Sequence, residues 1–161
     1  MNLHSLFNMQ RDLDTFIQSN RSVEGGIFRQ KGLALLVELA ELANETRCFK
    51  FWGIKGPSER SVILEEYVDS IHFLLSLGIE KELEALVQWP EAVAERDLTE
   101  LFLGTQAAIH TFIENHSMAN YEKVWSWYGA LALALDFNYD EVLEAYIAKN
   151  QTNYDRQKQG Y

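Results

Sequence analysis

The sequence contains little that would mark a secreted or membrane protein. Its 161 residues include a single cysteine, Cys48, so no internal disulfide can form, and this composition fits a reducing compartment. No apolar run reaches the roughly 18 residues that a membrane span needs, and the N-terminus lacks the basic start and long apolar core of a signal peptide. We therefore expect one cytoplasmic domain over residues 1–161, without membrane contact.

Basic residues are also scarce, with 14 Lys and Arg against 24 Asp and Glu, which gives a formal net charge of -10. This charge argues against a general affinity for nucleic acid or for an anionic membrane surface. It does not exclude a polyphosphate ligand, because a bound Mg²⁺ ion can reverse the local field. For the chain as a whole, the charge favours solubility.

No segment alternates apolar and polar residues over five or more positions, so the sequence shows no strand pattern. The fold class is therefore predicted to be all-α. Helical spacing predicts helices over residues 2–18, 28–47, 58–77, 97–114, 121–137 and 138 onward. Residues 79–96 are expected to form a surface segment with a short helix.

Local signals predict where several of these helices begin and end. Ser58 is the predicted N-cap of the third helix, and Gly78 is expected to end it. Asn120 is a candidate cap for the helix over 121–137. The last helix is expected to open at Asn138, with Glu141 completing a capping box.

The stretch Leu33–Ala43 is apolar nearly all the way round, which predicts a buried central helix. Glu38 and Glu41 nevertheless lie inside it, three residues apart and therefore on one face. Glu66 and Asp69 repeat this spacing beside another apolar run. Buried carboxylates normally pair, become neutral or bind a metal.

Four carboxylates on two facing helices would form a site for divalent cations, and Mg²⁺ suits them because it takes oxygen ligands and bridges to phosphates. Two alternatives are a di-iron carboxylate bundle and an ordinary exposed acidic face. The di-iron class uses Glu-x-x-His from each of two helices. This chain offers only Asp69-x-x-His72, which disfavours that class.

Other polar residues lie in apolar or aromatic surroundings. Gln10, one turn before Asp14, falls on the buried stripe of the first helix and is either a core amide or a group that reads a ligand. In the loop over 48–58, Lys50 and Trp52 could hold phosphate and stack on a base, or Trp52 could plug the core. His72 alone is more typical of a structural histidine.

The end of the chain carries cations and amides in helical register. Lys149, Asn153 and Arg156 fall on one face, which suits phosphates and a polar ring better than a frayed basic tail. The helix over 121–137 carries Trp125 and other large aromatic residues. It is expected to be a buried helix or a dimer interface, and the helix over 97–114 a bundle wall or subunit contact.

Together these residues resemble a known family. Glu38-x-x-Glu41, followed after 24 residues by Glu66-x-x-Asp69, is similar to the signature of the all-α nucleoside triphosphate pyrophosphatases, which include MazG-type enzymes and dimeric dUTPases. Four further stretches resemble the dimeric dUTPases specifically. They are M-Q-x-x-L-D at 9–14, F-K-F-W at 49–52, D-S-I-H-F-L-L-S-L-G at 69–78 and K-N-x-x-N-x-x-R-Q-x-x-G-Y at 149–161.

The resemblance implies a four-helix-bundle-like core with extra helices, a homodimer, and hydrolysis of dUTP, and of dUDP, to dUMP. It implies two or more Mg²⁺ ions, with Mn²⁺ as a substitute, on Glu38, Glu41, Glu66 and Asp69. Glu38 or Glu41 would orient and deprotonate the attacking water.

The resemblance also assigns residues to the substrate. Uracil would be recognised and covered by Gln10 and Trp52, and the deoxyribose would pack on Phe73 with His72 beside it. The residues expected to contact phosphates are Lys50, Lys149, Asn153 and Arg156, supported by Asn150 and Tyr161. Asp14 lies where the family pattern has Asn nearby, and His72 stands where relatives can carry Asn.

Two other hypotheses remain at this point. One is a MazG-like pyrophosphatase of different base specificity, for dCTP or for several dNTPs, which base preference would distinguish. The other is a non-catalytic helical dimer that binds a protein partner, which would not be stabilised by Mg²⁺ with a non-hydrolysable dUTP analogue.

Overall fold

The computed structural model describes residues 2–21, 25–94 and 96–160. Within these ranges the chain forms six helices: α1 (His4–Arg21), α2 (Phe28–Thr46), α3 (Arg60–Glu80), α4 (Leu98–Glu114), α5 (Met118–Ala134) and α6 (Tyr139–Lys158). The only β-type pairing in the described ranges is an isolated bridge between Asn2 and Gln88. The all-α prediction is confirmed.

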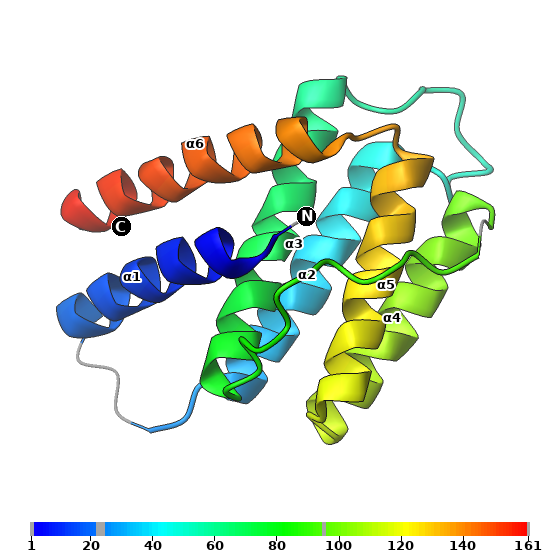
Figure 1. Ribbon diagram of the computed structural model, residues 1–161. Helices are drawn as coiled ribbons and strands as arrows, with labels where there is room; N and C mark the ends of the chain where they lie inside the picture. Colours follow the sequence, from blue (N-terminus) through cyan, green and yellow to red (C-terminus); the bar gives the residue numbers. More distant parts are fainter. Residues whose placement is uncertain (1, 22–24, 95, 161) are drawn as a thin grey trace.

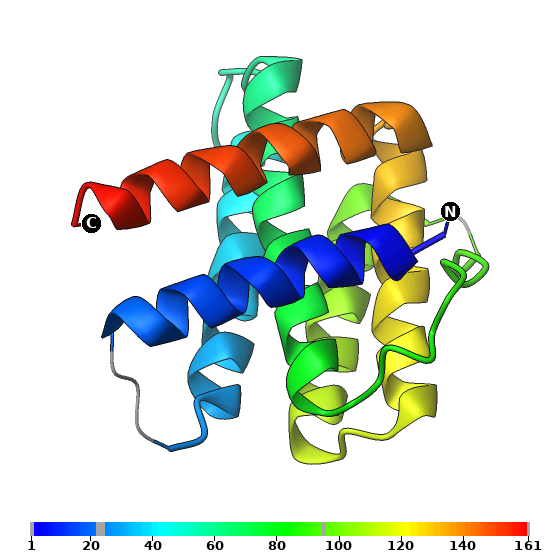
Figure 2. The same ribbon diagram turned by 60° about the vertical axis from the view of Figure 1, so that its left-hand side comes forward.

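Helices α2 to α5 form the core bundle, in which α2 packs on α3 and on α4, and α4 packs on α5. Helices α1 and α6 lie side by side across this bundle and both pack on α3 (Figures 1 and 2). They run in the same direction, since Gln10 meets Tyr146 and the ring of Phe16 lies 5.1 Å from that of Tyr154. The arrangement matches the predicted four-helix-bundle-like core with extra helices.

Helix α2 is central but not buried on every side. Leu35, Leu39 and Leu42 face the core, whereas Leu33 is 63% exposed and Val37 is 47% exposed. The expectation of a helix buried all round is wrong on this face, because α2 has packed neighbours on only two sides.

The predicted start of α3 is wrong by about one residue. The residue that caps α3 is Glu59, and the Ser58 hydroxyl instead donates to the carboxylate of Glu45 at the end of α2. Ser58 therefore ties the loop after α2 back to that helix.

Gly78 does not end α3, which continues to Glu80. A Cβ atom on Gly78 would lie 2.1 Å from the hydroxyl oxygen of Tyr121, which is fully buried. The glycine is thus explained by the close approach of α5 to α3, and not by a helix terminus.

Two local predictions in the second half of the chain are also wrong. The described part of residues 79–96 contains no helix after α3. Instead, this segment packs on the core through Leu83, Leu86 and Trp89. The indole N–H of Trp89 donates to the Trp125 carbonyl at 3.0 Å. The N-cap of α5 is Ser117, whose hydroxyl accepts from the Asn120 backbone N–H at 3.3 Å.

Helix α5 buries its aromatic face, because Trp125 and Tyr128 are fully buried in the core, whereas Leu133 on the same helix is 71% exposed. The side chains of Trp125 and Tyr128 are therefore unavailable to a subunit interface. Helix α6 begins with the predicted capping box between Asn138 and Glu141 and remains helical to Lys158. Among the described residues, no helix combines the length and the hydrophobicity needed to cross a membrane.

Candidate active site

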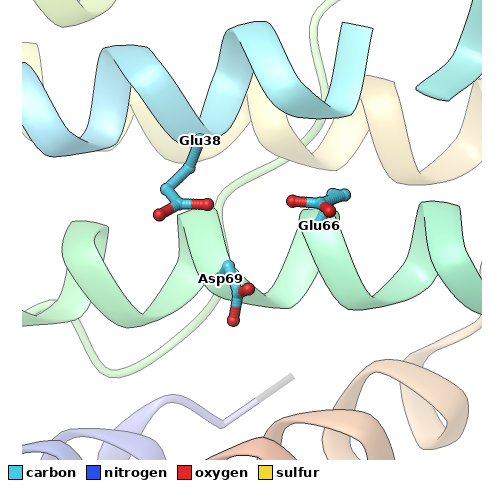
Figure 3. Close-up of side chains that lie close together, drawn as sticks. All are labelled: Glu38, Glu66 and Asp69. Atoms are coloured by element: carbon cyan, nitrogen blue, oxygen red, sulfur yellow. The ribbon is translucent and has the colours of Figure 1, made fainter. Parts of the chain in front are cut away.

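Three of the four predicted carboxylates come together between α2 and α3. One carboxylate oxygen from each of Glu38, Glu66 and Asp69 lies within 4.8 Å of the others. Glu38 and Glu66 turn toward the gap between the two helices, and Asp69 turns toward the side of α3 on which α6 packs (Figure 3). Glu41 is exposed on the face of α2 that also carries Val37.

Burial raises the pKa values of all three carboxyl groups, and for Glu38 and Glu66 the neighbouring carboxylates add to the shift. Burial, reinforced by the charges of Asp69, Glu41 and Glu66, raises the pKa of Glu38 to about 7. Burial and the neighbouring carboxylates Asp69 and Glu41 also raise the pKa of Glu66. Burial raises the pKa of Asp69, although Lys149 opposes this shift. The carboxylates therefore lack sufficient compensating positive charge.

Lys149 on α6 supplies the cation that contacts this cluster. Its ammonium nitrogen lies 2.7 Å from Asp69 Oδ2 and 2.7 Å from Glu65 Oε1, and its side chain is 11% exposed. Hydrogen bonds to these two carboxylates raise the pKa of Lys149 despite its burial. The ammonium group is therefore held in place, with its charge, at the edge of the cluster.

A cavity of about 410 Å³ adjoins the carboxylates and lies between α1, α2, α3 and α6. This volume is within the range of small-molecule sites. The predicted site residues that line it are Gln10, Asp14, Glu38, Asp69, His72, Phe73, Lys149, Asn153 and Arg156. Its walls are acidic at Glu38 and Asp69, carry cations from α6, and include apolar surface from Leu13, Ile17 and Phe73.

The wall formed by α1 contains a hydrogen-bonded network. The Gln10 side chain is bonded to the side chains of Asp14, His72 and Tyr146, each at 2.8 Å. The His72 ring stacks on the Tyr146 ring with centroids 4.1 Å apart. Burial, together with the charge of Lys149, lowers the pKa of His72 to about 3, so the imidazole is neutral at pH 7.

Several predicted site residues lie outside this cavity. Trp52 is 67% exposed, so it does not plug the core, and Lys50 donates to Asn44 Oδ1 at 2.5 Å. Neither residue lines the cavity. Asn150 is buried without being part of the lining, and Tyr161 lies outside the described residues.

The site residues that were not predicted include Lys31, Glu65, Ser76 and Tyr146. Helical register could have suggested all four. Ser76 lies seven residues after Asp69, Lys31 seven before Glu38, Glu65 four before Asp69 and Tyr146 three before Lys149. Register does not predict their partners, since these depend on how α6 packs on α1 and α3.

The donor set fits a divalent cation. Three carboxylate oxygens converge, and burial together with neighbouring carboxylates raises the pKa of Glu38 and Glu66. Hard oxygen ligands are those that Mg²⁺ and similar ions prefer. The adjoining cavity also carries Lys149 and Arg156 from α6, so carboxylates that could hold a metal lie beside cations that could contact a phosphorylated ligand.

A comparison with protein families matches the family described as dUTPase over residues 2–161. The chain therefore belongs to the dimeric all-α dUTPase family. This membership supports dUTP diphosphatase activity and dependence on a divalent metal. It argues against the hypothesis of a non-catalytic helical dimer that binds a protein partner. A comparison with curated proteins finds no match to the chain.

Proposed function

We propose that the protein is a Mg²⁺-dependent dUTP diphosphatase that converts dUTP, and also dUDP, to dUMP in the cytoplasm. The observation that carries the proposal is the family match over residues 2–161, with the acidic cluster placed at the edge of the cation-lined cavity. A nucleotide in this cavity would have its phosphates between the carboxylates and α6.

The metal ligands in this proposal are Glu38, Glu66 and Asp69, with Glu41 as a fourth carboxylate close enough to raise the pKa of Glu38 and Glu66. When bound, two or more Mg²⁺ ions, or Mn²⁺ in their place, would supply positive charge that neutralises the phosphate oxygens and polarises the attacking water. The i, i+3 spacing within each pair lets two helices contribute all four groups.

In the reaction, water attacks phosphorus and a new phosphorus–oxygen bond forms. The bridging bond between dUMP and the departing pyrophosphate breaks, and the proton of the water passes to Glu38 or Glu41. Glu38 is suited to this role because it is half-buried, lies in the cluster and lines the cavity. Lys149 and Arg156 would compensate the charge that develops on the leaving group.

Substrate contacts are assigned to the other walls. Lys149, Asn153 and Arg156 share one face of α6 and bind the phosphates, supported by Lys50, Asn150 and Tyr161. Phe73 packs on the deoxyribose with His72 beside it. Gln10 reads uracil, and Trp52 covers the base from the loop between α2 and α3.

Product analysis with each dNTP and UTP, in Mg²⁺ with and without EDTA, tests the proposal. We expect dUMP and pyrophosphate from dUTP alone, and no reaction in EDTA. Cleavage of several dNTPs would place the enzyme among the MazG-like pyrophosphatases of broader specificity. If none of these nucleotides were cleaved, the proposed function would be wrong.

A matched pair of variants separates catalysis from folding. Glu38→Gln should lower kcat by at least about a hundredfold while the protein remains folded. Glu144→Gln, an exposed carboxylate on α6 outside the cavity, should leave kcat unchanged. Unchanged turnover in Glu38→Gln would remove the role of this carboxylate.

We also propose that the protein is a homodimer. The support is the apolar exposed face of α2, with Leu33 and Val37, beside α4, where Leu103 is 54% exposed. Leu103→Glu should give a monomer in sedimentation equilibrium, whereas Leu133→Glu on α5, 71% exposed, should not. A wild-type monomer at micromolar concentration would contradict the proposal.

A further inference from the structure

We infer that Asp14 is a positioning residue that fixes the orientation of the Gln10 amide, so that the cavity offers a hydrogen-bond donor to the base. The inference rests on the proposed function for its kinetic consequence, but the orientation itself can be tested without substrate. Asp14 lies on α1, one turn after Gln10, and its side chain is 13% exposed.

Both ends of the Gln10 side chain are engaged. The Nε2 atom donates to Asp14 Oδ1 at 2.8 Å. The Oε1 atom lies 2.8 Å from His72 Nδ1 and accepts from the Tyr146 hydroxyl at 2.8 Å. An amide has two donor hydrogens and two acceptor lone pairs. Three of these four positions are therefore used, and the one that remains is an N–H donor.

Of the three partners, only Asp14 can decide which way the amide faces. A carboxylate accepts hydrogen bonds and cannot donate them, so it requires the NH₂ end of Gln10. The Tyr146 hydroxyl can either donate or accept, and a neutral His72 can place its proton on either nitrogen. Those two groups adapt to the amide, whereas the amide must adapt to Asp14.

Asp14 is itself held in this position. Its second oxygen, Oδ2, accepts from the Ser76 hydroxyl at 2.5 Å and lies 3.7 Å from the Lys31 ammonium nitrogen. Lys31 is anchored in turn by Glu80, at 3.0 Å. Because these contacts come from α2 and α3, the orientation of an α1 side chain is set by the packing of three helices.

The same arrangement fixes the tautomer of His72. With Gln10 Oε1 facing Nδ1 at 2.8 Å, the His72 proton must be on Nδ1. The opposite tautomer would place two lone pairs against each other at that distance, in a buried site where an unmade hydrogen bond is costly. The tautomer of His72 therefore reports the orientation of the Gln10 amide.

The orientation has a consequence for base preference. A remaining N–H donor suits a carbonyl oxygen, and uracil has a carbonyl at position 4 where cytosine has an amino group. The amino group offers no acceptor to Gln10. If the amide were reversed, the site would present an oxygen and lose this distinction. Asp14 would thus favour uracil without contacting the nucleotide.

The first test is the tautomer of His72 in the nucleotide-free protein, measured by long-range ¹H–¹⁵N correlation spectra. The His72 signals are identified as those that disappear in His72→Gln. The other histidines, His4, His110 and His116, are exposed and serve as internal references. We expect a protonated Nδ1 in the wild type. In Asp14→Asn we expect a mixture of tautomers, because the asparagine amide can donate to Gln10 as well as accept from it. Asp14→Ala should show a mixture of tautomers. If the Asp14→Ala protein does not fold, Asp14→Leu is measured in its place. A protonated Nε2 in the wild type, or the same tautomer in all variants, would overturn the inference.

The second test is the ratio of kcat/KM for dUTP to that for dCTP. Asp14→Ala should lower this ratio by about tenfold, and Asp14→Asn should lower it as well, because an asparagine amide can meet either end of the Gln10 amide. Asp12→Ala, an exposed carboxylate on the same helix, is the control and should change nothing. An unchanged ratio in Asp14→Ala would overturn the link to base preference. If the wild type cleaved neither nucleotide, the proposed function would fail while the spectra would still decide the positioning role.

Discussion

The ammonium nitrogen of Lys149 lies 2.7 Å from the Asp69 carboxylate, so a positive charge from α6 sits at the edge of the acidic cluster between α2 and α3. Its second contact, with Glu65 at 2.7 Å, is made on the exposed side of α3. The same ammonium group is assigned to the phosphates. Lys149 therefore compensates the carboxylates in the free protein and is in reach of the substrate.

We predict that Lys149→Met lowers the free energy of unfolding of the metal-free protein at pH 7.5 by about 1 to 2 kcal/mol. The variant leaves Asp69 without its hydrogen-bonded cation and strengthens repulsion within the cluster. Urea denaturation in EDTA measures the change. Lys158→Met is the control, since Lys158 and its partner Asp155 are mostly exposed, and equal effects of the two substitutions would contradict the prediction.

The raised pKa of Glu38 predicts a pH-dependent stability. In the unfolded chain this carboxyl has its ordinary pKa of 4.5, and in the folded protein it is about 7. The folded state therefore binds the proton more tightly, so the stability that this group contributes is present below pH 4.5 and is lost as the pH rises to about 7. Glu38→Gln should remove this loss.

We expect metal-free Glu38→Gln to be more stable than the wild type at pH 8 by about 1 to 2 kcal/mol, after allowance for solvent screening of a half-exposed group. At pH 4.5 the two proteins should differ much less. Denaturation in EDTA at both pH values measures this. Added Mg²⁺ should reverse the order at pH 8 by stabilising the wild type, and a pH-independent difference would argue against the assigned shift.

Trp52 offers a test of the loop between α2 and α3. Because Trp52 is 67% exposed, Trp52→Ala should change the free energy of unfolding by less than about 0.5 kcal/mol. If its ring covers the base, the same variant should raise KM for dUTP by about tenfold. Ile54→Ala, at an exposed position of the same loop, is the control. An unchanged KM would remove Trp52 from the site.

Gly78 tests the packing of α5 on α3. Gly78→Ala should destabilise the protein by about 2 to 3 kcal/mol, because the added Cβ would overlap the Tyr121 ring in a filled core. Thermal and chemical denaturation measure the loss. Gly56→Ala, where no atom lies within 4 Å of the added Cβ, should be close to neutral. A neutral Gly78→Ala would show that α3 can end or shift at this point.

Helical register predicted much of the fold and part of the site. Glu38, Glu66 and Asp69 converge as their spacing indicated, and Lys149, Asn153 and Arg156 line one cavity. Residues on one face of a helix stay together whatever the helix packs against, which accounts for the α3 pair and for the α6 residues. That Glu38 meets the α3 pair depends on the packing of α2 on α3.

Where packing decides, helical register does not predict the surroundings of a residue. Glu41 lies about 60° around the axis of α2 from Glu38. The boundary between the face of α2 that packs on other helices and its exposed face falls between these two residues. The apolar composition of α2 did not reveal that boundary. Likewise, Ser58 and Gly78 carry ordinary helix-end signals, but a carboxylate from α2 and a tyrosine from α5 determine their actual roles.

The parallel placement of α1 and α6 has a consequence for the order in which the site is assembled. Gln10 and Tyr146 are 136 residues apart in the chain, yet they meet in one wall of the cavity. Forming this contact closes a loop that spans nearly the whole chain, at a cost in conformational entropy. During synthesis, the carboxylates of α2 and α3 are made before Lys149 and before the α6 wall of the cavity. A ribosome-bound chain that stops before α6 should neither bind the nucleotide nor hold Asp69 in its ion pair.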